Sequence, residues 1–587
     1  MKKIFISAAA ALVIASCSGP KDGEYRINLL TTNDLHGSYL DSTYVGDKTR
    51  TSMLAAKYYV DSVRTADGKE NVILLDAGDF LQGDNAAYFF NYVDTASTHI
   101  FSRMAEYIGY DVIVGGNHDI ETGHAVYDRV SAEIRKAGIP FLAGNAIRND
   151  DGKRYFPEYT ILKKNGLKIA VLGYENANIK AWLNESLWSG MHFESLIPLV
   201  QQDVDRIVSK EKPHLVIVAC HTGTGAGDGK ALESQGLDLF NSLKNVDAVV
   251  CAHDHSPYTT SNEDNSMILV NAGSHARFVG HGILNISVKG GKVVSKSHEA
   301  ELIPVSVEKT DAVMREQFRS DYLKVKEFTS QEVGELKVDF NNRECLAGMC
   351  DYLNFIHTVS IACSPAELSI AAPINANGMI KAGKLIYNDL FSLYQYENQL
   401  FVVKFSGKEI KDYLEVSYAQ WIQTVSKPGD HVLNIASRPD RSGGPARWSF
   451  RGPTYNLDSM AGLNYTVDVT KPEGERITIT TLANGEAFDM DRTYNVAMTS
   501  YRASGGGDLM PKIGVDTDRI DERVVMKYPE IRELMYDYLK EHGSIDPAVI
   551  GDPAVIGHWE FVPENIAGPG IAADMELLYP AQRPDRP

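Results

Sequence analysis

Five strand-like segments in the first half of the chain end in polar side chains. One of them, VIVGGNHD at residues 112–119, passes from branched apolar residues through two glycines to Asn, His and Asp. A buried core would have to satisfy each of these polar groups, so their recurrence requires a chemical reason. The polar side chains that follow the five segments are Asp34, His36, Asp79, Asn117, His118, His221, His253 and His255.

These eight side chains have the composition of a metal-binding set. Two aspartates, one asparagine and five histidines, without a thiolate, suit Zn²⁺, Mn²⁺, Fe or Co better than Ca²⁺. Eight donors are too many for one tetrahedral ion and match two ions that share a carboxylate. Two metals about 3.5–4 Å apart can stabilise the attacking and leaving oxygens of a phosphoryl displacement. The set therefore predicts a hydrolytic centre with two divalent metal ions.

The elements that must position this set alternate between strands and helices. Helix-like stretches at 51–66 and 125–138 lie between the strand-like segments. This alternation predicts an α/β fold, in which ligands bind at the carboxyl ends of the strands. The polar residues at the strand ends are therefore expected to converge on one edge of the fold.

The order D-x-H-G, G-D-x-x-x-G, G-N-H-D, H-T-G and H-x-H resembles the calcineurin-like metallophosphoesterases. More narrowly, it is similar to the exported 5′-nucleotidase/UDP-sugar hydrolases and 2′,3′-cyclic-nucleotide 2′-phosphodiesterase/3′-nucleotidases, over about residues 25–545. The resemblance implies two ligand sets and a bridge: Asp34, His36 and His255 for one metal, Asn117, His221 and His253 for the other, and Asp79 between them. It also implies a catalytic dyad of His118 and Asp119, which protonates the leaving group or stabilises the developing charge.

From about residue 340 the chain resembles the 5′-nucleotidase C-terminal domain, in which two aromatic rings enclose the nucleobase. The matching positions are Tyr396 and Tyr501, with Asn398 and Asp508 as polar neighbours of the nucleoside. Stacking of a base on an aromatic ring contributes about 1–3 kcal/mol and tolerates different bases. Residues 371–384 lack an arginine that could hold the substrate phosphate or sugar, so the ester that is cleaved remains open.

The resemblance divides the chain into an N-terminal metallophosphatase domain of β-sheets flanked by helices and a C-terminal α/β nucleotidase domain. The expected segments are a signal peptide at 1–17, the dimetal domain at 25–306, a linker helix at 307–340, the C-terminal domain at 341–548 and a tail at 549–587. Within the tail, residues 566–587 are rich in Pro and Ala and are expected to pack loosely. Because the metal and base sites lie on different domains, a rotation between the domains is expected to bring substrate to the metals.

The N-terminus and the net charge limit location and partners. A basic start, an apolar run and Cys17 indicate a bacterial lipoprotein signal, so we expect a periplasm-facing or surface protein whose membrane contact is the lipidated Cys17. The net charge of −19 disfavours a nucleic-acid polymer as a partner, whereas nucleotides remain suitable substrates. Pairing of Cys345 with Cys350 and the oligomeric state stay open.

The sequence thus predicts metal-dependent hydrolysis of nucleotide phosphate esters outside the cytoplasm, for nucleotide scavenging. Three alternatives remain. The scaffold could act on UDP-sugars or other organophosphates, it could be a nucleotide-binding lipoprotein without catalysis, or it could hydrolyse sulfate- or thiosulfate-bearing conjugates.

Overall fold

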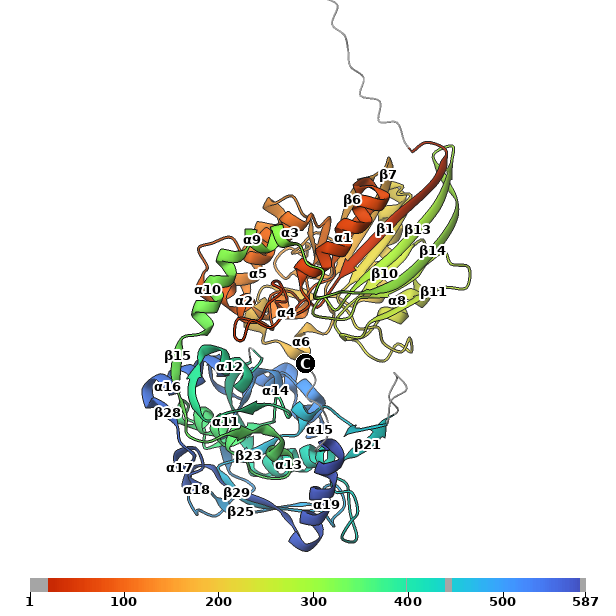
Figure 1. The fold of residues 1–587 in the computed structure, drawn as a ribbon. Helices are drawn as coiled ribbons and strands as arrows, with labels where there is room; N and C mark the ends of the chain where they lie inside the picture. Colours follow the sequence, from red (N-terminus) through yellow and green to blue (C-terminus); the bar gives the residue numbers. More distant parts are fainter. Residues whose placement is uncertain (1–19, 397, 439–445, 581–587) are drawn as a thin grey trace, which may run out of the picture.

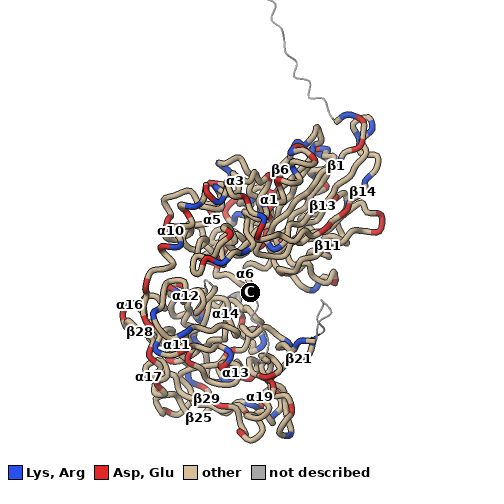
Figure 2. The backbone as a smooth tube through the Cα atoms, viewed as in Figure 1, with Lys and Arg blue, Asp and Glu red and all other residues tan. Residues whose placement is uncertain are grey.

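The computed structural model describes residues 20–580 apart from 397 and 439–445, so the predicted signal segment and Cys17 lie outside the described residues. Two domains face each other across an interface, and α9 (Ala312–Gln317) and α10 (Arg319–Thr329) run along one side from the first domain towards the second (Figure 1). Lysine and arginine positions are interspersed with acidic ones along the backbone of both domains (Figure 2). None of the helices in the described ranges has the length and apolar character needed to cross a membrane.

The N-terminal domain contains two six-stranded sheets packed face to face. The first has the order β14-β13-β1-β2-β3-β4, from β1 (Gly23–Thr32), β2 (Val72–Asp76), β3 (Val112–Val114), β4 (Phe141–Leu142), β13 (Phe278–Lys289) and β14 (Lys292–Pro304). The second has the order β11-β12-β10-β9-β7-β6, from β6 (Tyr159–Lys164), β7 (Leu167–Tyr174), β9 (Leu215–Cys220), β10 (Ala248–Cys251), β11 (Tyr258–Ser261) and β12 (Ile268–Asn271). Inward-facing residues such as Leu29, Ile73 and Ile217 are completely buried between them. The predicted β-sheets flanked by helices are confirmed.

Helices cover both outer faces of this sandwich. The first sheet packs against α1 (Met53–Asp67), α3 (Ile100–Ile108) and α5 (His124–Lys136), and the second against α7 (Leu196–Glu211) and α8 (Gly236–Ser242). Strands β1 to β4 are parallel to one another, as are β7, β9, β10 and β12. The carboxyl ends of these strands therefore lie at one edge of the sandwich, and the loops after β1, β2, β3, β9 and β10 come together there.

The C-terminal domain is built on a five-stranded sheet with the order β23-β17-β26-β20-β27. Its strands are β17 (Leu368–Ala371), β20 (Gln399–Ser406), β23 (Ser459–Ala461), β26 (Thr493–Thr499) and β27 (Val524–Glu530). Along β20, Leu400 and Val402 pack towards α11 (Asp351–Ala362) and α16 (Ile531–His542), whereas Phe401 and Val403 pack towards α13 (Gly407–Trp421). The two-residue period of a strand thus supplies both cores of the domain. The predicted α/β class is confirmed here as well.

The predicted linker contains α9 (Ala312–Gln317) and α10 (Arg319–Thr329). Met314, Phe318 and Val325 pack into the core of the N-terminal domain, so both helices rest on that domain. The strand that follows, β15 (Glu332–Leu336), already pairs with β19 (Gly383–Ile386) of the C-terminal domain. The disulfide left open by the sequence joins Cys345 to Cys350.

The expectation of loose packing for residues 566–587 is wrong for the described part of that segment, because Ala567, Ile571 and Leu578 belong to the C-terminal core. Strand β29 (Gly557–Val562) pairs in parallel with β24 (Leu463–Asp468), and α19 (Glu564–Leu578) follows it. Trp559 and Phe561 are about 5% exposed and belong to the C-terminal core. The apolar face of α19, together with the aromatic residues of β29 beside it, outweighs the Pro and Ala content that suggested weak packing. The last residues, 581–587, lie outside the described range.

Candidate metal centre and interdomain cavity

The candidate ligands occupy loops with unusual backbone conformations. Asp34, His36, Asp79, His253 and His255 all have positive φ, between 44° and 71°. Such left-handed conformations are uncommon for residues other than glycine and cluster at functional sites. Backbone hydrogen bonds join two of the loops, from Asp34 N to Gly78 O at 2.8 Å and from His36 N to Asp79 O at 2.9 Å. The surrounding fold therefore maintains these conformations.

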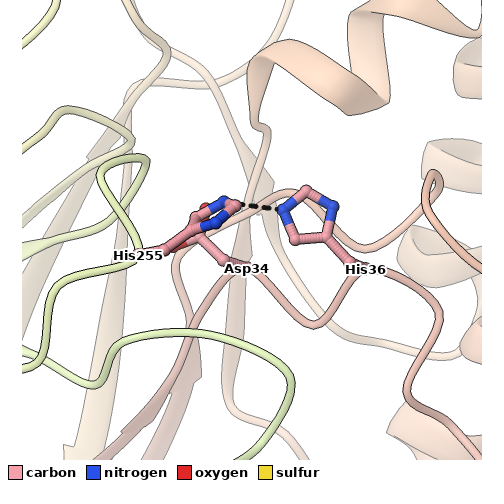
Figure 3. Close-up of side chains that lie close together, drawn as sticks. All are labelled: Asp34, His36 and His255. Carbon is pink, nitrogen blue, oxygen red and sulfur yellow. Dashed lines mark hydrogen bonds and ion pairs between the residues drawn. The ribbon is translucent and has the colours of Figure 1, made fainter. Parts of the chain in front are cut away.

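The structure gathers the candidate ligands into two adjacent groups. In the first, His36 Nε2 lies 2.9 Å from His255 Nε2, which lies 3.5 Å from Asp34 Oδ1 (Figure 3). In the second, which also contains His253, His221 Nε2 lies 3.0 Å from Asp79 Oδ2. Asn117 joins this group, with its Oδ1 2.8 Å from His253 Nδ1. The groups meet where Asp34 Oδ1 lies 3.9 Å from His221 Nε2.

Hydrogen bonds behind the ligands orient the imidazole rings. His221 Nδ1 lies 2.8 Å from Ala77 O, and His36 Nδ1 lies 3.2 Å from Gln82 O. Because a ring that donates from Nδ1 to a carbonyl keeps its Nε2 lone pair, both rings present Nε2 as a ligand atom. Gly116 is required beside them, since a Cβ there would lie 2.3 Å from Asp79 Oδ1.

The chemistry of the cluster fits two divalent cations. Asp34, Asp79 and His221 are completely buried. Within the described residues, Asp79 Oδ2 and His221 Nε2 have no hydrogen-bond partner, although they lie close together. Burial raises the pKa of Asp34 to about 7, against the influence of His221. Burial would also raise the pKa of Asp79, but His221 and His118 together hold it well below its usual value. Cations at this position would satisfy these atoms and compensate the buried charge.

His118 lies in α4 (Asn117–Glu121), but its partner is not the predicted one. Its Nδ1 lies 2.5 Å from Glu121 Oε2, one helical turn away. Burial lowers the pKa of His118, but Asp79 and Glu121 outweigh this and raise it to about 10. The predicted dyad with Asp119 is therefore corrected to His118 with Glu121, because residues three apart share a helix face and adjacent residues do not.

Asp119 has a different function. Its carboxylate accepts hydrogen bonds from four backbone N–H groups at 2.9–3.0 Å, those of Asp79, Phe80, Leu81 and Gly116. It is completely buried and joins the loop that carries Asp79 to the start of α4. Asp119 therefore positions the metal ligands instead of contacting His118.

A cavity of about 470 Å³ lies between the domains and is bounded by both of them. Asn117, His118, His253 and His255 line it on the metal side. Tyr396, Asn398, Tyr455 and Tyr501 line it from the C-terminal domain. Trp182, the last residue of α6 (Ile179–Trp182), also lines it and stacks on His253 with ring centroids 4.9 Å apart. In this conformation the metal ligands and the predicted base-binding tyrosines share one cavity, and the expected domain rotation stays a prediction.

The glycines at 505–507 shape the tyrosine side of the cavity. Tyr501, in α14 (Ser500–Ala503), lies so close to Gly506 that a Cβ there would be 2.4 Å from the ring. The neighbouring Arg502 is buried, with Nε 2.7 Å from Asp458 Oδ2, and donates to the carbonyls of Gly506 and Tyr455. Arg502 therefore links the segments that carry Tyr455 and Tyr501.

Two predicted substrate-binding residues differ in their placement. Asn398 lines the cavity, with its side-chain nitrogen 3.3 Å from Tyr394 Oη. Asp508 is exposed and lies outside the cavity lining, so it is not brought together with the tyrosines as expected. Its positive φ of 60° places it at the turn before α15 (Leu509–Lys512).

Sequence reasoning missed several cavity residues, namely Glu121, Trp182, Glu233 and Tyr455. The spacing of Glu121, three residues after His118 in a helix, could have identified it. Tyr455 is one of 29 tyrosines, and its surrounding sequence gives no comparable signal. Trp182 ends the short helix α6 and Glu233 lies in the loop between β9 and α8, and the place of both at the cavity depends on long-range contacts.

Comparisons with known proteins agree with the two-domain division. The calcineurin-like phosphoesterase family matches residues 27–257, and the 5′-nucleotidase C-terminal domain family matches residues 332–513. The chain is 23% identical to the 2′,3′-cyclic-nucleotide 2′-phosphodiesterase/3′-nucleotidase of Yersinia enterocolitica, over 93% of this chain and 90% of that protein. It is 22% identical to the 5′-nucleotidase of Vibrio parahaemolyticus, over 93% of this chain and 95% of that protein.

A third relative is much longer. The trifunctional nucleotide phosphoesterase protein YfkN of Bacillus subtilis is 23% identical over 94% of this chain, which spans only 40% of its length. Among solved structures, the 5′-nucleotidase precursor of Thermus thermophilus superposes with a TM-score of 0.59 at 18% identity, over 92% of this chain and all of that one. This last likeness concerns the fold alone.

Proposed function

We propose that this chain, which belongs to the calcineurin-like phosphoesterases with a 5′-nucleotidase C-terminal domain, hydrolyses phosphate esters of nucleotides. The reaction would be that of a 5′-nucleotidase, a 2′,3′-cyclic-nucleotide phosphodiesterase/3′-nucleotidase, or both. The observation that supports this best is the interdomain cavity, which joins two groups of metal ligands to three tyrosines. A substrate with a phosphate at one end and a flat aromatic group at the other matches that arrangement.

The metal half would hold the phosphate. Asp34, His36 and His255 would hold one divalent ion, Asn117, His221 and His253 the other, and Asp79 would bridge them. When bound, Zn, Mn, Fe or Co ions supply charge stabilisation for the phosphate and for the attacking and leaving oxygens. The donor types do not distinguish among these metals, and supply in the cell contributes to the choice.

His118 would act on the reacting phosphate. Glu121 fixes the ring through Nδ1, so the Nε2 edge is available to the substrate. Asp79 and Glu121 both favour the protonated ring, and a protonated imidazole can donate a proton to the leaving oxygen or stabilise its developing charge. Asp119 would support this step through the backbone that it holds.

The tyrosine half would hold the nucleoside. Tyr396 and Tyr501, the proposed base-binding residues, line the cavity, and Tyr455 adds a third ring. Stacking on such rings would favour a nucleobase of any identity by about 1–3 kcal/mol. Asn398 would supply a polar contact, whereas Asp508, which lies outside the cavity lining, is assigned none.

The location of the protein is part of the proposal. Lys2, Lys3, the apolar run that follows them and Cys17 support export and lipid attachment, so the substrate would be scavenged outside the cytoplasm. Incorporation of radiolabelled fatty acid into the wild-type protein, and its loss in Cys17→Ser, would test the anchor. Labelling that persists in Cys17→Ser would contradict it.

The direct test is product release from 5′-AMP, 3′-AMP, 2′,3′-cyclic AMP and UDP-glucose with Mn²⁺, Zn²⁺ or a chelator. Chelator-sensitive turnover of 5′-AMP without the cyclic ester would identify a 5′-nucleotidase. Turnover of the cyclic ester and 3′-AMP would identify the other branch, and UDP-glucose alone would favour the sugar-nucleotide alternative. If no ester of the panel is cleaved although two metals are bound, the proposed substrate class is wrong.

A further inference from the structure

Four carboxylates line the interdomain cavity: Glu121, Glu233, Asp254 and Asp458. Glu121 is paired with His118, and Asp458 with Arg502. Asp254 accepts hydrogen bonds from Thr224 N at 2.7 Å and from the side-chain nitrogen of Asn271 at 2.8 Å. Glu233 differs from these three, because its side chain has no hydrogen bond or ion pair with any residue in the described ranges.

The backbone at Glu233 is nevertheless fixed. Its carbonyl oxygen accepts hydrogen bonds from Gly223 N at 3.0 Å, the Thr222 hydroxyl at 3.0 Å and the Asn176 side chain at 3.1 Å. These donors belong to loops at the carboxyl ends of β9 and β7. The N-terminal domain therefore holds the backbone of Glu233 in place, while its side chain is exposed at the cavity, where a ligand can contact it.

Glu233 shares the cavity lining with Tyr396, Tyr455 and Tyr501, and its charge acts on two of these rings. Burial raises the pKa of Tyr455, and the negative charge of Glu233 adds to that effect. Burial also raises the pKa of Tyr501 to about 12, with a smaller contribution from Glu233. Because a carboxylate repels a phosphate, its place beside the rings suits the uncharged part of a substrate.

A substrate would also change the surroundings of Glu233. Partial burial raises the pKa of Glu233, and the carboxylate of Asp508 adds to this effect. A ligand stacked on the tyrosines would displace further water from it. A carboxylate that loses water without gaining a donor is costly, whereas a hydrogen bond to a charged group is among the stronger polar contacts.

We propose that Glu233 is a specificity-determining residue whose carboxylate accepts a hydrogen bond from an N–H or O–H group of the bound nucleoside. This inference rests on the proposed function and adds a contact from the N-terminal domain to the nucleoside held by the C-terminal domain. The donor is either an amino group of the base or a hydroxyl of the ribose. Nucleosides without that donor would bind more weakly.

The test compares the wild-type protein with Glu233→Ala and Glu233→Gln. With the nucleotide that the wild type hydrolyses best, Glu233→Ala is expected to raise KM about tenfold or more, with kcat and bound metal unchanged. Glu233→Gln keeps an acceptor oxygen, so its KM is expected to lie between those of the wild type and Glu233→Ala. Turnover of p-nitrophenyl phosphate and bis(p-nitrophenyl) phosphate, which carry no nucleoside, should not change. Glu263→Ala removes an exposed carboxylate outside the cavity and serves as the matched control.

Calorimetry with nucleosides identifies the donor without requiring turnover. Adenosine is compared with purine riboside, which lacks the amino group, and with 2′-deoxyadenosine, which lacks one ribose hydroxyl. If Glu233→Ala abolishes the preference of the wild type for adenosine over purine riboside, the donor is the amino group of the base. If it abolishes the preference for adenosine over 2′-deoxyadenosine, the donor is on the ribose. Equal adenosine affinity in wild type and Glu233→Ala, or an equal loss of nitrophenyl ester turnover, would overturn the inference. Failure of the wild type to cleave any nucleotide would instead contradict the proposed function.

Discussion

The two sides of the interdomain cavity are built in different ways. On the metal side, five ligand residues adopt left-handed backbone conformations, and buried hydrogen bonds hold their loops. On the tyrosine side, Tyr396, Tyr455 and Tyr501 come from separate segments of the C-terminal domain, and Tyr455 is 39% exposed. On the metal side the surrounding fold fixes the position of each candidate ligand atom. The tyrosine side instead offers ring faces on which a ligand can stack.

This difference follows from the chemistry of each side. Metal–ligand bonds require atoms placed within a few tenths of an ångström, so backbone strain and buried supporting groups are tolerated there. Stacking depends on area and tolerates small displacements and different bases. With the substrate proposed above, the cavity would combine precise placement of the phosphate with permissive binding of the nucleoside.

The largest effect is expected when a metal ligand is removed. His253→Ala or Asn117→Ala should lower turnover about 10³–10⁴-fold for every ester, since each metal contributes several kcal/mol to the stabilisation of charge. Metal content measured by mass spectrometry should fall from two equivalents towards one. His192→Ala, which removes an exposed histidine far from the cluster, should change neither quantity. Full metal content with full activity in His253→Ala would contradict the ligand assignment.

The corrected partner of His118 gives the next effect. Glu121→Gln should lower kcat about 10–100-fold with both metals retained, because the imidazole loses the group that orients and charges it. Asp119→Asn should act on the fold instead, since an amide cannot accept all four backbone N–H groups and leaves some unsatisfied. Thermal unfolding would show a lower Tm for Asp119→Asn and little change for Glu121→Gln. A loss of kcat without a change in Tm for Asp119→Asn, and a lower Tm for Glu121→Gln, would favour the original prediction of a dyad between His118 and Asp119.

A smaller and more selective effect is expected on the tyrosine side. Tyr501→Ala and Tyr455→Ala should each raise KM for nucleotides about tenfold, because each removes one stacking contact. Turnover of p-nitrophenyl phosphate, which has no nucleobase, should not change. Steady-state kinetics on both substrates measures the selectivity. Tyr396→Ala tests whether the ring of Tyr396 contributes as much to nucleotide binding as the other two rings. An equal loss on both substrates for Tyr501→Ala would remove its role in base binding.

The last prediction concerns the stability of the C-terminal domain at acid pH, and it leaves the cavity unchanged. Burial lowers the pKa of His357 from 6.5 to about 3 in the folded protein. Between these values the unfolded chain binds a proton that the folded protein does not, so stability falls as pH falls below 6.5. At pH 5 the loss is about 2 kcal/mol. The decrease in Tm from pH 7 to pH 5 should be smaller in His357→Gln than in the wild type, with exposed His558→Gln as the control. An equal decrease in all three would exclude this histidine as the cause.

The sequence determined the class of fold and the residues of the metal cluster. Apolar strands that end in Asp, His or Asn are local patterns, and parallel strands bring their carboxyl ends to one edge whatever the details of packing. For this reason Asp34, His36, Asp79, Asn117, His221, His253 and His255 could be named from the chain and are found together. The roles assigned to them remain predictions for experiment.

Only the tertiary structure decided what surrounds that cluster. Tyr455 and Glu233 are separated by more than two hundred residues and meet at the cavity only because two domains face each other. The Asp119 carboxylate binds the backbone of the loop that carries Asp79 and does not contact the His118 ring. Strand β29 extends a sheet that the composition of the tail did not predict. Long-range contacts leave no periodic pattern in the sequence, whereas strand ends do. The sequence therefore identifies the chemistry, and the packing of the two domains determines which substrate can reach it.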